Sequence, residues 1–464
     1  MTDVAVFRAT GAGVAAAVAA RDAGAQVTLV EPGAHVGGMV SGGLSWTDVG
    51  DTRVLGGFAR RFYQAVADRY GARLFELPGP EPHVAEEILE SFLDGVARET
   101  ELPDAAVYVD ASYEGDLLPR FGVPYAVGRE SRERYGERWA GRQPAYRPSK
   151  HNFSTVLSPF REDGSLLPHI REPELDEDGR PIEALGAGDA GLQAYGFRVC
   201  LTDRDSVPFA QPEGYDPAEF ELLDRYRAAN PDAQLLGLVH DLLPHGKCDV
   251  NSIGPFSLNV LDGSNRDYLD GDREAVRAHH LEYTKRFLFH VSPPGWGLCA
   301  DEFVDTGGWP HQLYVRDARR MLGEYVLTER DLVQPRPQSD VVALGSYNID
   351  IREIERTWRM LPEYSPTPAV FNEGYLSVPV PPYPIPYRAL TPKRENAPNL
   401  LVPVCLSASH VAFASVRMEP TFMLLGHAAG VAAAEAARDG VAVQDVDVEA
   451  VQRSLLDAGQ VLAL

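Results

Sequence analysis

The residues best suited to chemistry lie close together late in the chain. Ser407, Ser409 and His410 follow a predicted buried strand, and they supply polar groups that can exchange a proton with a substrate. The alternative for His410 is a structural role in capping a turn. Arg417 and Glu419 can anchor a substrate carboxylate, or they can pair with each other at the start of the next helix. We therefore predict His410, Arg417 and Glu419 as the catalytic candidates, with proton transfer as their chemistry.

The N-terminal residues have the pattern of a dinucleotide-binding unit. An apolar strand at 4–7 leads into a helix of small residues, and a second strand at 27–30 ends at Glu31. An acidic residue in this place would hydrogen-bond a ribose hydroxyl, and the small side chains let the helix pack tightly on a parallel sheet. The pattern predicts nucleotide binding, and the alternative is a strand-helix-strand unit that binds nothing.

The phosphate-binding turn of this unit departs from the usual glycine pattern. Counting back from Glu31 aligns the G-x-G-x-x-G window with residues 8–13, so Arg8 and Thr10 replace two glycines and only Gly13 remains. Arg8 has two interpretations. Its guanidinium could bind a pyrophosphate through two hydrogen bonds, or it could pair with Glu31 and fill the ribose site, which would abolish cofactor binding.

Two further segments would lie on the ligand side of such a sheet. The glycine-rich segment 37–43 lets a backbone approach a flat ligand closely. The strand at 107–110 ends in an acidic turn, which is typical of the ligand-side edge of an α/β sheet. Both segments predict a ligand at the carboxyl ends of the strands.

Composition argues against several classes of function. The 464 residues carry a net charge of −24, which opposes binding to nucleic acids and to anionic membranes. No apolar stretch is long enough to span a bilayer, and no basic and apolar leader precedes the first strand. The four cysteines are far apart and form no C-x-x-C motif, so we expect no metal site. We expect a cytoplasmic protein that acts on a small-molecule substrate.

The order of the predicted elements indicates an α/β fold with a discontinuous nucleotide domain. Residues 1–130 and 385–464 have the strand and helix patterns of such a domain. We predict that residues 131–384 form an inserted cap or substrate domain of mixed α+β structure. The segment 362–386, rich in proline and tyrosine, should be extended and carry a crossing between the domains.

Several longer motifs, in the right order, resemble one known family. Over nearly its whole length the chain is similar to the FAD-dependent oxidoreductases with a glutathione-reductase-like Rossmann domain. The likeness rests on the motifs at 31–39, 110–117, 308–315, 345–350 and 407–420.

The resemblance implies an extended FAD. Its ribose would lie on Glu31, its pyrophosphate at the start of the first helix, and its ring near the glycine-rich segment. A helix N-terminus offers N–H groups and partial positive charge to a phosphate. The predicted cofactor-binding residues are Arg8, Thr10, Gly11, Ala12, Gly13, Glu31, Gly37, Gly38, Met39 and Gly43.

The family also implies a strand and a hairpin whose backbone flanks the adenine. Only residues 94–104 separate the preceding helix from the next predicted strand, so we expect this adenine wall to be missing. Replacing Arg8 by glycine alone should then fail to restore FAD binding in a protein that has lost it.

The substrate candidates offer an aromatic floor, an amide and a positive charge for a ring-shaped or sugar-like ligand. Each could instead be packed core or, for the arginine, part of a surface ion pair. They are Arg198, Trp309, His311, Tyr347 and Asn348.

Three functions follow from these residues. The first is an FAD-dependent oxidoreductase that oxidises a small organic substrate by hydride transfer to the flavin while His410 or a partner takes a proton. The second is a flavin-free enzyme that uses the former flavin pocket for non-redox proton transfer, as an isomerase, lyase or cyclase. The third is a catalytically silent binding protein. The weight of the family resemblance favours the first.

Overall fold

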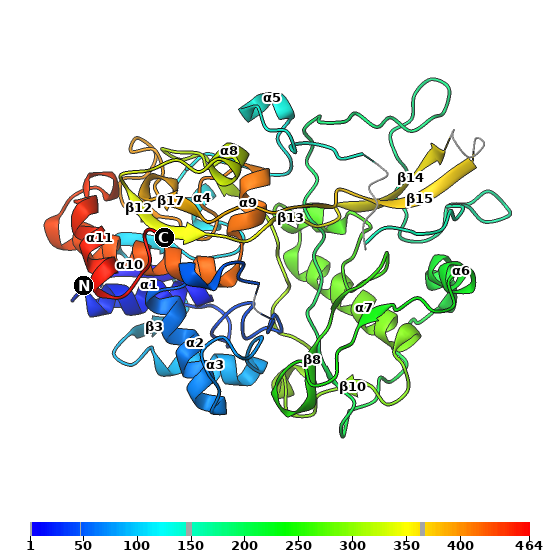
Figure 1. Ribbon diagram of the computed structural model, residues 1–464, viewed down its shortest axis with the longest axis horizontal. Helices are drawn as coiled ribbons and strands as arrows, with labels where there is room; N and C mark the ends of the chain where they lie inside the picture. Colours follow the sequence, from blue (N-terminus) through cyan, green and yellow to red (C-terminus); the bar gives the residue numbers. More distant parts are fainter. Residues whose placement is uncertain (1, 47, 145–150, 362–366) are drawn as a thin grey trace. The chain divides into compact units, whose positions relative to one another are not determined.

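The chain forms two compact units. The computed structural model describes residues 2–46, 48–144, 151–361 and 367–464. Unit 1 comprises residues 1–127, 317–350 and 378–464, whereas unit 2 comprises residues 128–316 and 351–377. Unit 1 therefore combines both ends of the chain, which are blue and red in Figure 1. It also contains residues 317–350, which the sequence analysis places in the cap.

Unit 1 is built on a five-stranded sheet with the strand order β18-β4-β1-β2-β3. Every neighbouring pair in this sheet is parallel. The pairing of β18 with β4 places the C-terminal part of the chain beside strands from the N-terminal part. The strands are β1 (Thr2–Phe7), β2 (Val27–Val30), β3 (Ala97–Glu99), β4 (Ala105–Asp110) and β18 (Leu400–Leu401).

Two helices of small residues pack together in unit 1, α1 (Gly11–Asp22) and α10 (Glu419–Asp439). A Cβ at Gly426 would lie 2.2 Å from the carbonyl oxygen of Ala12, and one at Gly430 would lie 2.2 Å from that of Ala16. The helices can therefore approach this closely only because α10 carries glycine at both positions. The sheet and α10 together bury the first ten residues of α1.

The remaining elements of unit 1 surround this sheet-and-helix core. Its other helices are α2 (Gly57–Tyr70), α3 (Pro82–Ser91), α4 (Leu117–Arg120), α8 (Glu329–Val333), α9 (His410–Val416) and α11 (Val448–Asp457). Its other strands are β5 (Tyr125–Ala126), β11 (Arg320–Met321), β12 (Val341–Gly345) and β17 (Tyr383–Pro386).

Unit 2 contains short antiparallel sheets and one long helix. Two of the four boundaries between the units fall within β13 (Ile349–Ile351) and β16 (Leu376–Val378). The helices are α5 (Arg132–Tyr135), α6 (Glu221–Ala229) and α7 (Arg273–Val291). The strands are β6 (Cys200–Thr202), β7 (Leu236–Gly237), β8 (Lys247–Asp249), β9 (Asn251–Ser252), β10 (Gly297–Leu298), β14 (Glu355–Leu361) and β15 (Thr367–Glu373).

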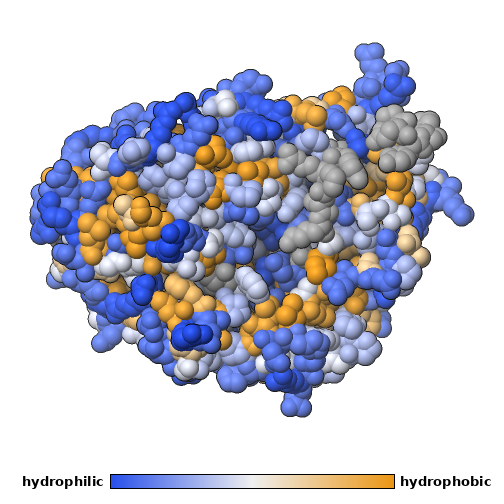
Figure 2. Space-filling view, in the orientation of Figure 1, coloured by the Kyte–Doolittle hydropathy of each residue, from blue (hydrophilic) through white to orange (hydrophobic). Residues whose placement is uncertain are grey.

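The segment 362–386 contains β15, β16 and β17, so most of it is extended, as its composition predicts. Residues 362–366 lie outside the described part of the chain. Among the described residues, no helix combines the length and the apolar character needed to cross a bilayer. On the face drawn in Figure 2, apolar residues lie in small groups among hydrophilic ones.

A histidine in unit 2 links two carboxylates. Nε2 of His169 lies 2.8 Å from Oε1 of Glu219, and Nδ1 lies 3.9 Å from Oδ2 of Asp262. Burial alone would lower the pKa of His169, but hydrogen bonds to Asp262 and Glu219 outweigh burial and raise it. The histidine thus links two segments of unit 2, and the two carboxylates favour its protonated form.

We expect His169→Asn to destabilise the protein at pH 6 by about 1–2 kcal/mol and by less at pH 9. The folded-state pKa of His169 is raised, so its contribution to the free energy of unfolding is complete below the unfolded pKa and disappears as pH rises through the folded pKa. Asparagine tolerates the φ of 58° at this position. Urea denaturation at the two pH values measures the effect. His240→Asn, at an exposed histidine, should change little at either pH; equal losses at both pH values for His169→Asn would contradict the prediction.

Candidate functional site

The turn between β1 and α1 keeps the backbone shape of a glycine turn. Arg8 has a φ of 75°, in the left-handed region that favours glycine. A Cβ at Gly13 would lie 1.9 Å from the carbonyl oxygen of Arg8, so this position excludes every other residue. Thr10 caps α1, because its Oγ1 accepts from the N–H of Gly13 at 3.1 Å and donates to the carbonyl of Ala111 at 2.9 Å.

The guanidinium of Arg8 binds the carboxylate of Glu31. Nη1 of Arg8 donates to Oε1 of Glu31 at 2.7 Å. The same carboxylate also accepts from the backbone N–H of Ala9 at 2.9 Å and of Gly33 at 2.8 Å. The two charged side chains are 30% and 18% exposed, so the pair is partly solvated. Of the two interpretations of Arg8, the structure therefore contains the one in which the guanidinium meets Glu31.

A pocket of about 240 Å³ opens beside this ion pair, at the carboxyl ends of β2 and β3. The short segment 94–104 forms β3, which lies parallel to β2. The strand that was expected to be missing is therefore present, because three residues suffice for an edge strand, but no hairpin follows it before β4. The pocket is lined by Ala9, Leu29, Glu31, Gly33, Ala34, His35, Val36, Arg98, Glu99 and Thr100.

The glycine-rich segment after β2 packs against the same turn. The N–H of Gly37 donates to the carbonyl of Ala9 at 2.6 Å. A Cβ at Gly38 would lie 2.5 Å from the hydroxyl of Tyr113, and that hydroxyl accepts from the N–H of Met39 at 2.9 Å. Gly43, further along, is buried. The structure thus brings most of the predicted cofactor-binding residues to one edge of the sheet.

The first residue of α10 lies at this edge as well. The hydroxyl of Tyr113 donates to Oε1 of Glu419 at 2.7 Å. Burial raises the pKa of Glu419 to about 8, although the hydrogen bond from Tyr113 opposes the shift. Tyr113 was not singled out by the sequence analysis, since nothing in its motif separates it from a packed aromatic residue.

Arg417 and Glu419 have different partners. Nη2 of Arg417 donates to the carbonyl of Asp350 at 2.7 Å and lies 3.1 Å from its carboxylate. Glu419 instead binds Tyr113. Arg417 therefore holds Asp350 within β13. Glu419, the first residue of α10, instead lies beside Gly11 at the start of α1.

His410 begins α9 and is 1% exposed. Its Nδ1 lies 3.5 Å from Oδ2 of Asp317, which is also buried. Ser409 caps the helix, since its Oγ accepts from the N–H of Ala412 at 3.1 Å. A histidine oriented by a carboxylate is a common general base. Asp317 lies far from His410 in the sequence and in an arginine-rich stretch, so no local pattern could have identified it.

The predicted substrate residues are divided between the units. Tyr347 and Asn348 belong to unit 1. Burial is the main cause that raises the pKa of Tyr347, and the negative charge of the nearby Asp48 raises it further. Arg198, Trp309 and His311 belong to unit 2.

Within unit 2, the substrate candidates have protein partners. Arg198 forms a buried ion pair with Asp249, at 2.7 Å, and so provides no free charge. The ammonium of Lys285 lies 5.8 Å from the ring centre of Trp309. The ring of His311 contacts that of Phe303, with their centres 5.7 Å apart.

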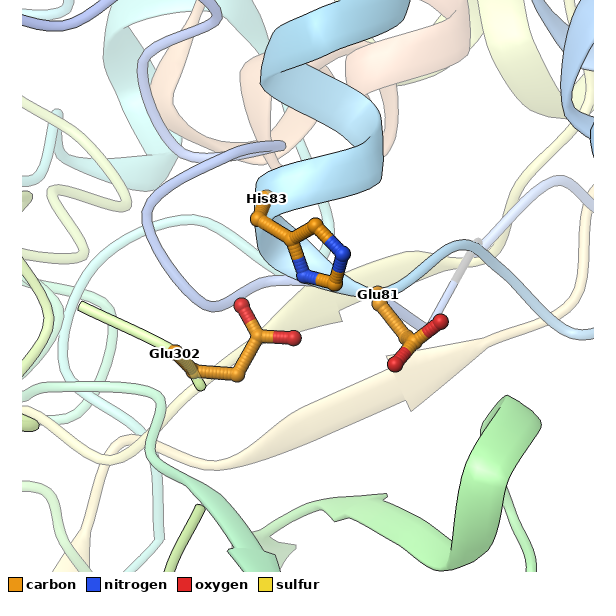
Figure 3. A group of neighbouring side chains, drawn as sticks. All are labelled: Glu81, His83 and Glu302. Atoms are coloured by element: carbon orange, nitrogen blue, oxygen red, sulfur yellow. The ribbon is translucent and has the colours of Figure 1, made fainter. Parts of the chain in front are cut away.

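Figure 3 shows Glu81 and His83 at the start of α3 in unit 1. Glu81 accepts a hydrogen bond from the hydroxyl of Tyr70 at 2.9 Å, which anchors the helix start to the end of α2. Glu302, labelled in the same picture, belongs to unit 2, where it accepts from Nζ of Lys247 at 2.6 Å.

Comparison with solved structures gives low structural similarity. The chain is 18% identical to a THI4 from Thermovibrio ammonificans, over 28% of this chain and 66% of that one, with a TM-score of 0.21. It is 15% identical to OxyS anhydrotetracycline hydroxylase from Streptomyces rimosus, over 28% of this chain and 35% of that one, with a TM-score of 0.23. For OTEMO in complex with FAD and NADP, the identity is 13%, the coverage 24% and 25%, and the TM-score 0.17.

No curated protein matches the chain. The family model described as FAD dependent oxidoreductase matches residues 3–103 and 96–455. These two matches cover most of the sequence. They include the turn at Arg8, the pocket beside Glu31, and the first residues of α1 and α10. The chain therefore belongs to the FAD dependent oxidoreductase family.

Proposed function

We propose that the protein is an FAD-dependent oxidoreductase that oxidises a small organic substrate by hydride transfer to the flavin. Unit 1 would be the discontinuous Rossmann-like FAD-binding domain, and unit 2 the cap or substrate domain. The observation that carries the proposal is the pocket beside Glu31 at the carboxyl ends of β2 and β3, in a chain of this family. Ligands of open parallel sheets bind at this edge.

The residues of unit 1 fit the adenosine and phosphate parts of FAD. Glu31 lines the pocket, where a carboxylate can accept hydrogen bonds from ribose hydroxyls. Gly11 and Ala12 carry the first N–H groups of α1, which precede its first intrahelical hydrogen bond, from Val14 to Thr10 at 2.9 Å. A Cβ at Gly11 would lie 3.0 Å from Met423 Cε, so glycine lets α10 pack closely against this helix start.

His410 is the residue that we propose as the base. When bound, FAD supplies the acceptor for a hydride, and a proton must leave the substrate in the same oxidation. Nδ1 of His410 lies 3.5 Å from Oδ2 of Asp317, so the carboxylate can orient the ring. Nε2 is then the ring atom that can take the proton. Arg417 fixes Asp350 and thereby positions the backbone that follows Tyr347 and Asn348.

The absorbance spectrum of the protein, purified without denaturation and recorded again after addition of FAD, tests the proposed function. We expect the two visible flavin bands in the purified protein or after the addition, and we expect FAD to remain with the protein through gel filtration. Heat denaturation should then release free FAD into the supernatant.

Absence of flavin bands before and after addition would overturn the proposal. The ion pair between Arg8 and Glu31 would then be the physical reason, because it engages the carboxylate that a ribose requires. The flavin-free proton-transfer enzyme would take the place of the oxidoreductase, and His410 with Asp317 would remain its candidate base.

A further inference from the structure

Two helices begin at the same place in unit 1. A Cβ added at Gly11, the first residue of α1, would lie 3.1 Å from Oε2 of Glu419, the first residue of α10. The carboxyl group of Glu419 therefore lies against the start of α1. Both helix starts carry partial positive charge, and the start of α1 also presents the N–H groups of Gly11 and Ala12, whereas Pro420 leaves α10 with one N–H group fewer. Their convergence makes this place suited to a negatively charged group.

The hydrogen bonding of Glu419 at this place is only half complete. Its Oε1 accepts from the hydroxyl of Tyr113 at 2.7 Å. Its Oε2 is buried and has no hydrogen-bond partner among the described residues. The whole residue is only 6% exposed, so bulk water does not reach this oxygen freely. A buried carboxyl oxygen without a donor is satisfied either by carrying a proton itself or by a ligand that brings one.

We propose that Glu419 is a proton-linked gate for the phosphate groups of a dinucleotide at the start of α1. As a neutral acid, its Oε2–H can donate to a phosphate oxygen that also meets the N–H groups of Gly11 and Ala12. As a carboxylate, it repels the phosphate and occupies the positive helix starts in its place. This inference rests on the proposed function for the identity of the dinucleotide, FAD.

One other carboxyl group near this place changes its ionisation near neutral pH. Burial raises the pKa of Asp110, at the end of β4, to about 7, but its carboxylate accepts from the hydroxyl of Ser112 and the N–H of Leu117 rather than contacting Glu419. The segment after β4 presents Tyr113, whose pKa is raised well above 10 by burial and by Glu419, so it stays neutral. The segment after β2 presents the N–H of Met39, which donates to Tyr113 rather than to Glu419. From α1 comes Gly11, and from α10 itself comes Met423, neither of which titrates. Arg417, two residues earlier, turns to Asp350.

The pH dependence of FAD affinity follows from these contacts. Burial raises the pKa of Glu419 to about 8, so the gate is neutral at pH 6 and mostly ionised at pH 9. Because FAD binds the protonated form, we expect its affinity to fall about tenfold between pH 7 and pH 9. Above pH 8, the slope of log Kd against pH should approach one, which corresponds to one proton taken up for each FAD bound.

The experiment measures the Kd of FAD by isothermal titration calorimetry from pH 6 to pH 9 in the full-length protein. Glu419→Gln, which is neutral at every pH and nearly isosteric, should bind as tightly as the wild type at pH 6 and show no slope. Tyr113→Phe removes the hydrogen bond that lowers the pKa of Glu419, so its midpoint should move to higher pH. Glu435→Gln, at another buried carboxyl of the same helix, should keep the wild-type profile. Circular dichroism checks that each variant is folded.

A flat wild-type profile, or an unchanged slope in Glu419→Gln, would overturn the gate. If the wild type binds no FAD at any pH, the proposed function fails, and inorganic pyrophosphate then tests the gate separately. Pyrophosphate should bind the wild type at pH 6 and not at pH 9, and should bind Glu419→Gln at both. Absence of pyrophosphate binding to both proteins at pH 6 would overturn the gate as well.

Discussion

Replacing Gly426 by alanine is expected to destabilise the protein by about 2 kcal/mol or more. In isolation the change favours a helix by up to ~1 kcal/mol, because alanine has the higher helix propensity. In this protein the added Cβ would lie 2.2 Å from the carbonyl oxygen of Ala12, so α1 and α10 must move apart along their whole contact. The lost packing therefore outweighs the gain in propensity.

Chemical denaturation measures this effect. Gly430→Ala meets the carbonyl oxygen of Ala16 at the same distance and should cost a similar amount. The double variant should lose less than the sum, since helices already separated at one glycine make room at the other. Ala437→Ser, which adds one atom at a half-exposed position of α10, should change the free energy of unfolding by less than about 0.5 kcal/mol. A stabilised Gly426→Ala variant would contradict the packing described for α1 and α10.

Replacing Arg8 by glycine is expected to raise the affinity for FAD about tenfold, which corresponds to ~1.4 kcal/mol. The change frees the carboxylate of Glu31 from its 2.7 Å contact and keeps the two backbone N–H groups that hold it in place. Stability should change little. Loss of a partly exposed ion pair costs about 0–1 kcal/mol, and relief of a left-handed arginine returns about 1 kcal/mol.

The alternative role of Arg8 predicts the opposite result. If the guanidinium turned away from Glu31 to bind the pyrophosphate, Arg8→Gly would weaken FAD binding instead of strengthening it. Arg98→Ala is the matched control, because it removes an equal charge from the same pocket without freeing Glu31. Fluorescence titration with FAD, and urea denaturation of the same variants, would separate the two outcomes.

The structure also changes one expectation about this variant. The sequence predicts that Arg8→Gly alone does not restore FAD binding in a protein that has lost it, because segment 94–104 is too short to flank an adenine. That segment forms β3 and lines the pocket through Arg98, Glu99 and Thr100. The glycine variant therefore keeps an edge strand beside the pocket, although no hairpin lies between β3 and β4.

The sequence predicts the parallel sheet of unit 1 well, because apolar strands followed by small-residue helices leave few other arrangements. β1, β2 and β4 form where the patterns at 4–7, 27–30 and 107–110 place them. The sequence does not predict β3, because its three residues are all exposed and show no apolar pattern. They are Ala97, Arg98 and Glu99.

The site was predictable only where its residues belong to local motifs. Glu31 and the turn at Arg8 follow from spacing along the chain. The partners of His410 and Glu419 do not, because Asp317 and Tyr113 come from distant segments that meet only in the folded chain. The ion pair of Arg198 with Asp249 forms because β6, which follows Arg198, pairs with β8, which ends at Asp249. Patterns in a single sequence do not specify that pairing.

The pairing of β18 with β4 has a consequence for how the chain folds during synthesis. The helix α10, which packs on α1, and the strand β18, which extends the sheet beside β4, lie beyond residue 399, whereas β1, α1 and β2 lie within the first 30 residues. While translation proceeds, the nascent N-terminal segment must therefore wait with exposed alanine and valine side chains until the last elements emerge. Most of unit 2, which is continuous from 128 to 316, can complete its contacts first. Chaperone dependence of this protein should accordingly concentrate on the N-terminal segment.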